Sequence, residues 1–173
     1  GDEGFNRTWG DLLTLARVGH VDYPVEPVDT DNVVREVLVE LKETVVDTGV
    51  VVTKGDLPKL YVPETLLAEI FRNLIDNALR YACRSGGTIE IGGARDGQIA
   101  RFYVRDHGPG IPEADRERIF EMFYRGAVGK TAKGTGIGLA IVRKIAQHYG
   151  GRAWVGETPQ GGSTFWFELE DRG

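Results

Sequence analysis

The stretch from 63 to 82, PETLLAEIFRNLIDNALRYA, decides the fold, because it carries the strongest helix signal in the chain. Pro63 suits the first turn of a helix, where its missing N–H group is not needed. Two apolar rows at helical spacing follow it: Leu66, Ile70, Leu74 and Ala78 in one, and Leu67, Phe71, Ile75 and Leu79 in the other. A stripe this broad predicts a helix whose one side is buried in the core of the domain.

The segments on either side of this helix predict a mixture of helices and strands. Before it, helices are expected at 5–20 and at 30–49, the second capped at Thr30 or Asp31 and stopped by Gly49. Further helices are expected at 113–123 and 137–150. Short strands are expected at 50–53, 59–62, 88–94, 98–106, 151–157 and 162–170, with a hairpin turn near 95–97. This order predicts an α+β fold with helices packed on one face of a mixed sheet.

The composition bounds what the chain can do. It has 173 residues, a net charge of -5 and 41% hydrophobic residues, as expected for one soluble domain that binds no nucleic acid. The single cysteine, Cys83, fits a reducing, cytoplasmic compartment, and no apolar run approaches the ~20 residues of a membrane span. Because Gly1 stands in place of a start methionine, we expect a fragment, and a membrane anchor elsewhere in the parent protein is left open.

A polar row runs along the same long helix. Glu69, Asn73 and Asn77 recur every four residues, and Arg80 and Arg84 fall close to the same line. Asparagine is a poor helix former, costing roughly half a kcal/mol relative to alanine, so a plain solvated face would favour other residues. Asparagine oxygens are hard, neutral ligands that suit Mg²⁺ bound largely by water and phosphate. The spacing alone is compatible with a solvated face and with a magnesium site.

The heptapeptide DHGPGIP, at 106–112, follows a predicted strand. The strand fixes the position of Asp106, whose carboxylate can accept a hydrogen bond from an exocyclic amine such as that of adenine. Gly108 and Gly110 allow the backbone to approach a ligand closely or to adopt a positive φ. A local strand-to-helix turn, with Pro112 starting the helix, is the alternative, but it does not require two glycines in three residues.

A glycine- and lysine-rich loop precedes the helix expected at 137–150. Its cations and glycines are Arg125, Lys130, Lys133, Gly126, Gly129, Gly134, Gly136 and Gly138. Free N–H groups at a helix start bind anions, so this loop indicates either a lid over phosphates or an ordinary surface loop. It is not a P-loop, because Tyr124 stands where the first glycine belongs. It is not a dinucleotide-fold fingerprint either, because Leu139 replaces the third glycine and no strand precedes it.

Five segments together resemble the boxes of the catalytic ATP-binding domain of sensor histidine kinases. In chain order these asparagine, glycine and phenylalanine boxes are NLIDNALRYA (73–82), DHGPGIP (106–112), IFEMFYRG (119–126), GTGIGLAIV (134–142) and GGSTFWFEL (161–169). The resemblance covers roughly 27–169, and it implies the Bergerat fold shared with gyrase-type ATPases, a two-layer α/β sandwich with a mixed, mostly antiparallel sheet. Residues 1–22 resemble the tail of the second dimerisation helix with its linker, so residues 23–173 would form the catalytic domain.

The resemblance implies roles for individual residues. Asp106 would bind the adenine amine, with Gly108 and Gly110 beside it, Thr164 supporting that contact through water, and Tyr81 lying along the base. Asn73 and Asn77 would hold Mg²⁺, and Arg80 would reach the phosphates. The remaining residues of the ATP site would be Arg125, Lys130, Lys133, Gly134, Thr135, Gly136, Gly138 and Leu139. Glu69 and Asn73 are the expected catalytic residues, although Glu69 is equally compatible with an ordinary surface role.

The resemblance also implies a reaction and its partners. The domain would transfer the γ-phosphate of ATP to a histidine on the parent's dimerisation domain, for relay to a response regulator. His20, His107 and His148 do not fit the family's acceptor box, so this fragment, expected to be a monomer from a homodimeric parent, would bind ATP but lack the acceptor. Two alternatives are a gyrase- or mismatch-repair-type ATP hydrolase, disfavoured because Asn73 replaces the catalytic glutamate, and a nucleotide-binding docking module without catalysis.

Overall fold

The computed structural model describes residues 2–81, 87–122, 124, 137–159 and 161–171. Its helices are α1 (Asp2–Arg17), α2 (Thr30–Glu40), α3 (Lys42–Thr48), α4 (Glu64–Tyr81) and α6 (Gly138–His148). Three short 3-10 helices lie at Val18–His20, Glu113–Asp115 and Arg118–Phe120. The strands are β1 (Val51–Lys54), β2 (Thr88–Asp96), β3 (Ile99–Arg105), β4 (Arg152–Glu157) and β5 (Ser163–Glu170).

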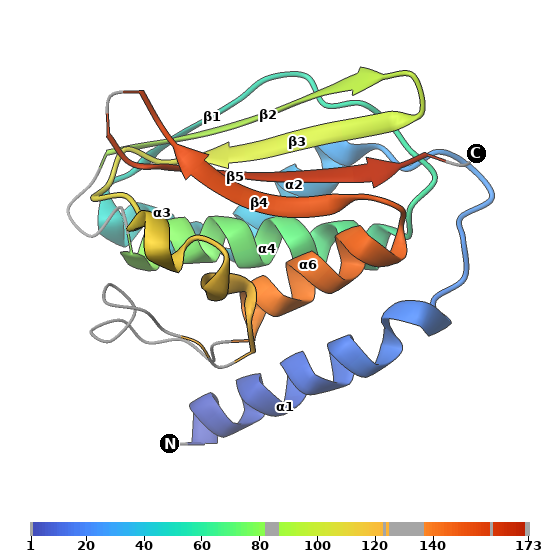
Figure 1. The fold of residues 1–173 in the computed structure, drawn as a ribbon, viewed down its shortest axis with the longest axis horizontal. Helices are drawn as coiled ribbons and strands as arrows, with labels where there is room; N and C mark the ends of the chain where they lie inside the picture. Colours follow the sequence, from blue (N-terminus) through green and yellow to red (C-terminus); the bar gives the residue numbers. More distant parts are fainter. Residues whose placement is uncertain (1, 82–86, 123, 125–136, 160, 172–173) are drawn as a thin grey trace.

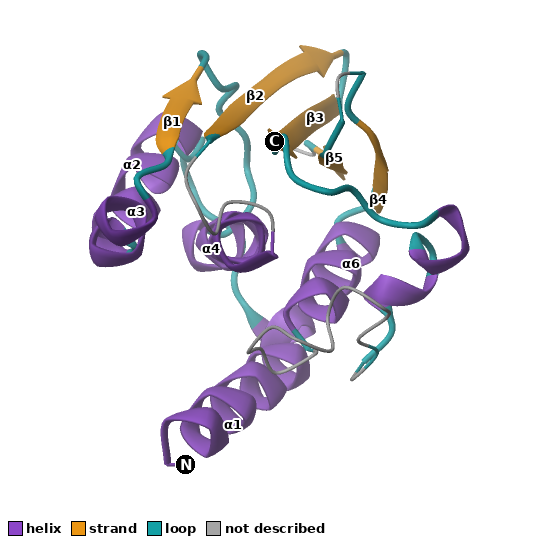
Figure 2. Cartoon of the chain, turned by 90° about the vertical axis from the view of Figure 1, so that its left-hand side faces the viewer, coloured by secondary structure: helices purple, strands orange, loops and turns teal. Residues whose placement is uncertain are grey.

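The five strands form one sheet in the order β1-β2-β3-β5-β4. Only β1 and β2 pair in parallel, and the other three pairs are antiparallel, so the sheet is mixed and mostly antiparallel. Helices α2, α3, α4 and α6 cover one face of it (Figure 1), and Figure 2 shows the same two layers end on. The predicted α+β class and two-layer arrangement are confirmed.

Helix α4 forms the centre of the core. All eight residues of its two predicted apolar rows are buried. Among them, Phe71 meets the rings of Phe102 and Phe167 edge-on, at centroid distances of 5.7 and 5.3 Å. Phe102 and Phe167 stack at 4.9 Å across β3 and β5. The apolar stripe of α4 therefore fixes which face of the sheet is covered.

The other face of the sheet carries half-exposed aromatic rings. Trp154 and Trp166 stack at 6.0 Å on β4 and β5, and Tyr103 on β3 lies 5.2 Å from Trp166. The guanidinium of Arg152 lies 4.2 Å from the centre of the Trp154 ring, and that of Arg105 lies 4.7 Å from the Tyr103 ring. These cation–π contacts cover part of the aromatic surface on the side of the sheet opposite the described helices.

Three sequence predictions were wrong in detail. The single helix predicted at 30–49 is two helices that meet at Leu41, where ψ is 11°, and the cap is Asp29, whose side chain accepts from the backbone N–H of Asn32. Thr30 is not the cap, because its hydroxyl donates to the carbonyl of Pro58. The strand predicted at 59–62 contributes one isolated bridge, from Leu60 to Val28.

The helix predicted at 113–123 is also replaced, by two 3-10 turns. Of the residues in these turns, only Phe120 is buried, so the segment lacks the apolar stripe that stabilises a short α-helix by packing. The Tyr124 hydroxyl donates to Asp115 at 2.6 Å and closes the segment locally.

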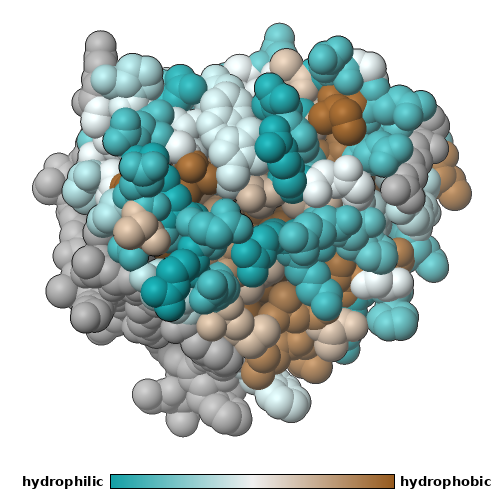
Figure 3. Space-filling view, viewed as in Figure 1, coloured by the Kyte–Doolittle hydropathy of each residue, from teal (hydrophilic) through white to brown (hydrophobic). Residues whose placement is uncertain are grey.

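Helix α1 packs against α6 (Figure 1), and part of the surface of α1 is exposed. Trp9 is 58% exposed and Leu13 is 37% exposed. The side seen in Figure 3 is mostly hydrophilic, and hydrophobic side chains show in the lower part of the view, where α1 and α6 lie in Figure 1. Within the described residues, no helix combines the length and apolarity that crossing a membrane demands.

Tyr149, at the end of α6, carries a buried hydroxyl that finds no hydrogen-bond partner in the described part of the chain. Its ring meets Tyr23 and His148 edge-on, and burial, followed by the charge of Tyr23, raises the pKa of Tyr149 to about 12. Because an unpaired buried hydroxyl costs about 1–3 kcal/mol, Tyr149→Phe is expected to raise the free energy of unfolding by about 1 kcal/mol.

Urea denaturation of both proteins measures this difference. Tyr149→Ala provides the contrast, because losing the ring is expected to cost about 3–5 kcal/mol. A clear loss of stability in Tyr149→Phe would show that the hydroxyl is bonded in solution.

Candidate functional site

The first part of the site lies where β3 ends and β5 begins. Asp106 is 3% exposed, although it directly follows the last strand residue. Its Oδ1 accepts hydrogen bonds from the backbone N–H groups of Gly108 and Ser163, both at 3.0 Å. Its own N–H donates to the carbonyl of Ser163 at 2.9 Å, which extends the β3–β5 pairing by one residue. The carboxylate is thus held at two backbone amides, and both bonds use the same oxygen.

A chain of hydroxyl groups supports the backbone of Asp106. The Thr158 hydroxyl donates to the carbonyl of Asp106 at 3.1 Å and lies 3.1 Å from the hydroxyl of Thr164. Because the single O–H of Thr158 is used in the hydrogen bond to this carbonyl, the Thr164 hydroxyl is the donor to Thr158. Arg105 in turn donates its Nε–H to Thr164 at 3.2 Å. Thr164 is therefore joined to the backbone of Asp106 through Thr158, and part of its bonding capacity is used within the protein.

Two glycines permit this close packing of loops. Gly110 has φ 80° and lies against Gly162, which has φ 99°. A Cβ on Gly162 would lie 2.2 Å from the carbonyl oxygen of Asp106 and 2.6 Å from the Cα of His107. Only glycine fits at 162, because the backbone conformation and the available space both exclude a side chain.

Burial is the largest influence on the carboxyl group of Asp106. It raises the pKa of Asp106 above 3.8, while the two backbone hydrogen bonds and the charge of His107 lower it. A carboxylate removed from water in this way gains from any ligand group that donates a hydrogen bond to it.

The second part of the site is the polar row on α4. Asn73 donates from Nδ2 to the backbone carbonyl of Glu69 at 2.8 Å and to Glu69 Oε2 at 3.4 Å. Burial raises the pKa of Glu69, and the neighbouring Arg72 opposes that shift. Asn73 and Asn77 are half-buried on successive turns, so the row is not the fully solvated face that the sequence left open as an alternative.

The start of α6 packs closely against this polar row. A Cβ on Gly138 would lie 2.6 Å from Asn73 Oδ1 and 3.2 Å from Asn73 Cγ. Ile137, the residue before α6, is buried, and Leu139 packs against the core. The structure therefore brings the predicted residues Glu69, Asn73 and Gly138 together at one point, where the oxygen of Asn73 faces the first turn of α6.

Other predicted residues lie near the end of α4. Arg80 forms an ion pair with the buried carboxylate of Asp76, with 2.8 Å between Nε and Oδ2. Tyr81 is the last residue of α4, but its side chain lies outside the described residues. Figure 1 shows this end of α4 at the same end of the molecule as the loop that follows β3. The predicted lid residues Arg125, Lys130 and Lys133 lie outside the described residues, as do the other predicted site residues Gly134, Thr135 and Gly136.

The sequence prediction missed the residues that hold Asp106. Thr158 and Ser163 are buried beside it, and Gly162 is indispensable to the packing. The glycine pair in GGST, at 161–164, was the available signal, because two adjacent glycines before a strand mark a special backbone conformation. Thr158 had no signal in the sequence, since its contact with Asp106 joins residues 52 positions apart.

The donor groups fit one class of metal ion. In the described residues, no three histidine, cysteine or acidic side chains gather to hold a metal on their own. The oxygen of Asn73 is a neutral, hard ligand facing a helix start, which suits Mg²⁺ that takes its other ligands from water and phosphate.

Comparisons with known proteins agree with this geometry. Residues 62–173 match the family model described as "Histidine kinase-, DNA gyrase B-, and HSP90-like ATPase". Cyanobacterial phytochrome B of Nostoc sp. is 38% identical over 163 residues, which cover 92% of this chain and 22% of the relative. The chain spans about a fifth of the length of this curated relative and of another that it matches.

Two solved structures share the fold. Full-length ShkA in complex with AMPPNP has a TM-score of 0.77 at 32% identity, over 94% of this chain and 35% of that chain. The catalytic domain of histidine kinase ThkA has a TM-score of 0.72 at 26% identity, over 87% of this chain and 98% of that one. The second likeness spans nearly the whole of that catalytic domain.

Proposed function

Because the chain belongs to the family of histidine kinase-, DNA gyrase B- and HSP90-like ATPases, we propose that it is the ATP-binding kinase domain of a sensor histidine kinase. It transfers the γ-phosphate of ATP to a histidine on a separate dimerisation domain, for relay to a response regulator. Residues 23–173 form this domain, and residues 1–22, which include α1, belong to the end of the dimerisation region and its linker. The buried carboxylate of Asp106, held by two backbone amides, is the observation that carries the proposal.

Asp106 recognises the base. Both described hydrogen bonds to its side chain go to Oδ1, so Oδ2 is available to the exocyclic amine of adenine. Guanine carries a carbonyl at the equivalent position, and two acceptors would then face each other. The AMPPNP bound by ShkA is an adenine nucleotide, which supports the same class of ligand here.

The phosphates lie between α4 and the start of α6. Asn73 and Asn77 would hold Mg²⁺, and Arg80 would approach the phosphate oxygens. The sequence assigns Arg125, Lys130 and Lys133, which lie outside the described residues, to the same phosphates. When bound there, Mg²⁺ would supply positive charge to offset that of the phosphates. Asn73 and Gly138 orient the triphosphate by their positions on two packed helices, which is the main contribution a protein makes to phosphoryl transfer.

Gly138 makes this arrangement testable. In Gly138→Ala the new methyl group would displace Asn73 Oδ1, so the affinity for Mg-ATP is expected to fall by about tenfold. The free energy of unfolding should change by less than about 1 kcal/mol, because alanine favours a helix. Calorimetric titration with Mg-ATP measures the affinity. Gly10→Ala, at a helical glycine with no atom within 4 Å of the new methyl group, is the matched control and should bind as the wild type does.

The alternative of an ATP hydrolase is less well supported. Such enzymes place a glutamate one turn before the magnesium-binding asparagine that corresponds to Asn77. Here that position, four residues before Asn77, is Asn73, whose amide cannot accept a proton. Glu69 lies one turn earlier, and its carboxylate is held by Arg72 and Asn73.

Labelled phosphate distinguishes these reactions. Given ATP labelled at the γ-phosphate, the isolated chain should bind nucleotide without becoming labelled, because its three histidines lie outside an acceptor box. Addition of the parent's dimerisation domain should produce an acid-labile phosphohistidine on that domain. Rapid release of inorganic phosphate by the chain alone, with no labelled histidine, would favour the hydrolase and overturn the proposal.

A further inference from the structure

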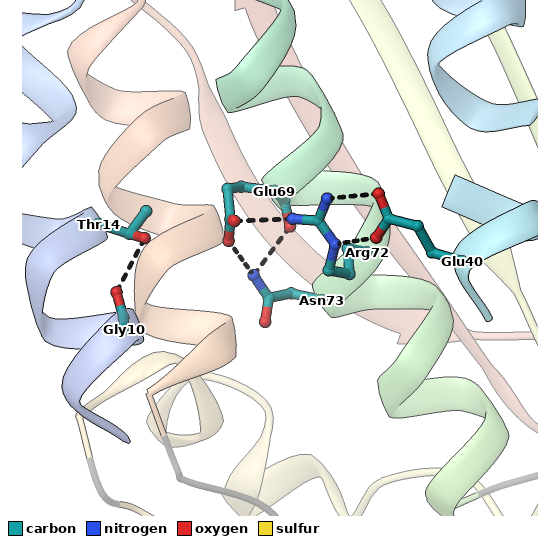
Figure 4. A network of polar contacts seen from close by, with 6 residues as sticks. All are labelled: Gly10, Thr14, Glu40, Glu69, Arg72 and Asn73. Atoms are coloured by element: carbon teal, nitrogen blue, oxygen red, sulfur yellow. Dashed lines mark hydrogen bonds and ion pairs between the residues drawn. The ribbon is translucent and has the colours of Figure 1, made fainter. Parts of the chain in front are cut away.

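One ion network joins α2 to the polar row of α4 (Figure 4). Glu40, the last residue of α2, accepts two hydrogen bonds from Arg72, at 2.8 Å to Nε and 3.1 Å to Nη2. The remaining arm of Arg72 donates from Nη1 to Glu69 Oε1 at 2.7 Å. The other oxygen of Glu69 faces Asn73 Nδ2, at 3.4 Å. Four side chains from two helices are therefore connected in a line that ends at Asn73.

The network determines how the amide of Asn73 is oriented. A side-chain amide can present either its oxygen or its NH₂ group, and a metal ion binds only the oxygen. Here two acceptors of Glu69, its backbone carbonyl and Oε2, face Nδ2. The amide nitrogen is thereby directed toward Glu69, and Oδ1 is directed toward the start of α6.

Arg72 keeps the Glu69 carboxylate in the position this requires. Glu69 is a flexible side chain, and without a partner it would sample rotamers that leave Nδ2 with the backbone carbonyl alone. The guanidinium is planar, and its bidentate contact with Glu40 fixes its plane, so the arm toward Glu69 has a defined direction.

We propose that Arg72 and Glu40 are positioning residues, which act through Glu69 to present the oxygen of Asn73 to the magnesium–nucleotide complex. This inference rests on the proposed function, but it assigns a role to two residues outside the binding segments. Neither residue is among those assigned to the ligand, and Glu40 lies on α2, whereas Asn73 lies on α4. Partners of metal ligands have this effect generally, because they orient the ligand atom before the metal arrives.

A purely structural role for the same contacts predicts a different outcome. The side chains of Arg72 and Glu40 are 33% and 51% exposed, and ion pairs this accessible add little to folding stability. If the network only tied α2 to α4, its loss would weaken nucleotide binding equally with and without Mg²⁺. If the network orients Asn73, only the gain in affinity that Mg²⁺ provides should fall.

The test compares ATP affinity in Mg²⁺ with ATP affinity in a chelator, using calorimetry on the full 173-residue chain. In Arg72→Gln the gain from Mg²⁺ is expected to fall by about tenfold, and in Glu40→Gln by about threefold. Affinity in the chelator should stay within about twofold of the wild type in both variants, because Asp106 is untouched. Glu43→Gln removes an exposed carboxylate on the neighbouring α3 and is the matched control, expected to keep the whole gain.

A second measurement needs no ligand. In the metal-free protein, the side-chain NH₂ resonances of Asn73 should move toward the values of a solvated amide in Arg72→Gln and in Glu69→Gln, but not in Glu43→Gln. The double variant Arg72→Gln with Glu69→Gln should lose no more of the Mg²⁺-dependent gain in ATP affinity than the more affected of the two single variants. The reason is that both substitutions break the same network of side chains.

The outcomes separate the two claims. A wild type that binds ATP with no gain from Mg²⁺ would overturn the proposed metal site itself. A normal gain in the wild type, kept in full by Arg72→Gln and Glu40→Gln, would leave the proposed function standing and overturn the positioning role. Equal losses with and without Mg²⁺ would also overturn that role.

Discussion

Asp106→Asn is expected to weaken ATP binding by about 30-fold. The variant exchanges one acceptor oxygen for an NH₂ group, and a hydrogen bond to a charged group contributes about 2 kcal/mol. The two backbone N–H groups at Oδ1 still find an oxygen in the asparagine, so the loop should keep its shape. The loss should therefore appear in binding much more than in folding.

Calorimetric titration with ATP and with GTP measures this effect. The wild type should prefer ATP, and Asp106→Asn should lose most of that preference, because its NH₂ group can face the guanine carbonyl. Asp47→Asn, an exposed position on α3, controls for the change in net charge. Unchanged ATP affinity in Asp106→Asn would remove adenine recognition from this carboxylate, and the proposed function with it.

The raised pKa of Asp106 adds a pH dependence with a definite sign. Because the pKa is higher in the folded protein than in the unfolded chain, the folded state holds more protons between those two values. The contribution of Asp106 to stability is therefore fully present below about pH 4 and is lost as the pH rises through the folded pKa. Urea denaturation across that range should show this loss in the wild type and a smaller one in Asp106→Asn.

Gly162→Ala is expected to lower the free energy of unfolding by about 3–5 kcal/mol. The new methyl group would overlap the backbone of Asp106 and His107, neither of which can move without breaking the contact between β3 and β5. Nucleotide binding should be lost with it, because the Asp106 carboxylate is held by the next residue, Ser163.

Gly161→Ala is a closely matched control for this substitution. Gly161 has φ 94°, nearly the φ of Gly162, but a Cβ there meets no atom within 4 Å. The free energy of unfolding of Gly161→Ala should fall by about 1–2 kcal/mol, from backbone strain alone. Equal melting temperatures for the two variants would show that the overlap at 162 is relieved in solution and does not position Asp106.

The accuracy of the sequence-based predictions depends on whether the deciding contacts are local. The buried rows of α4 and the β2–β3 hairpin were predictable, because their patterns repeat within a few residues, and Gly97 marks the turn with φ 62°. The break between α2 and α3 was not, because Leu41 lies inside a continuous helical pattern. Nor were the hydrogen bonds of Thr158, because Thr158 and Asp106 lie 52 positions apart in the sequence. The approach of Gly138 to Asn73 needed the fold as well.

Helix α4 carries site residues and core residues side by side. Asn73 directly precedes the buried Leu74, and Asn77 directly precedes the buried Ala78. A change inside the hydrophobic interior that tilts this rod by a small angle would carry both amides with it. Variants selected only for a higher melting temperature should therefore change in catalytic activity when their substitutions lie in the core beneath α4. Substitutions beneath β1 should change the activity much less.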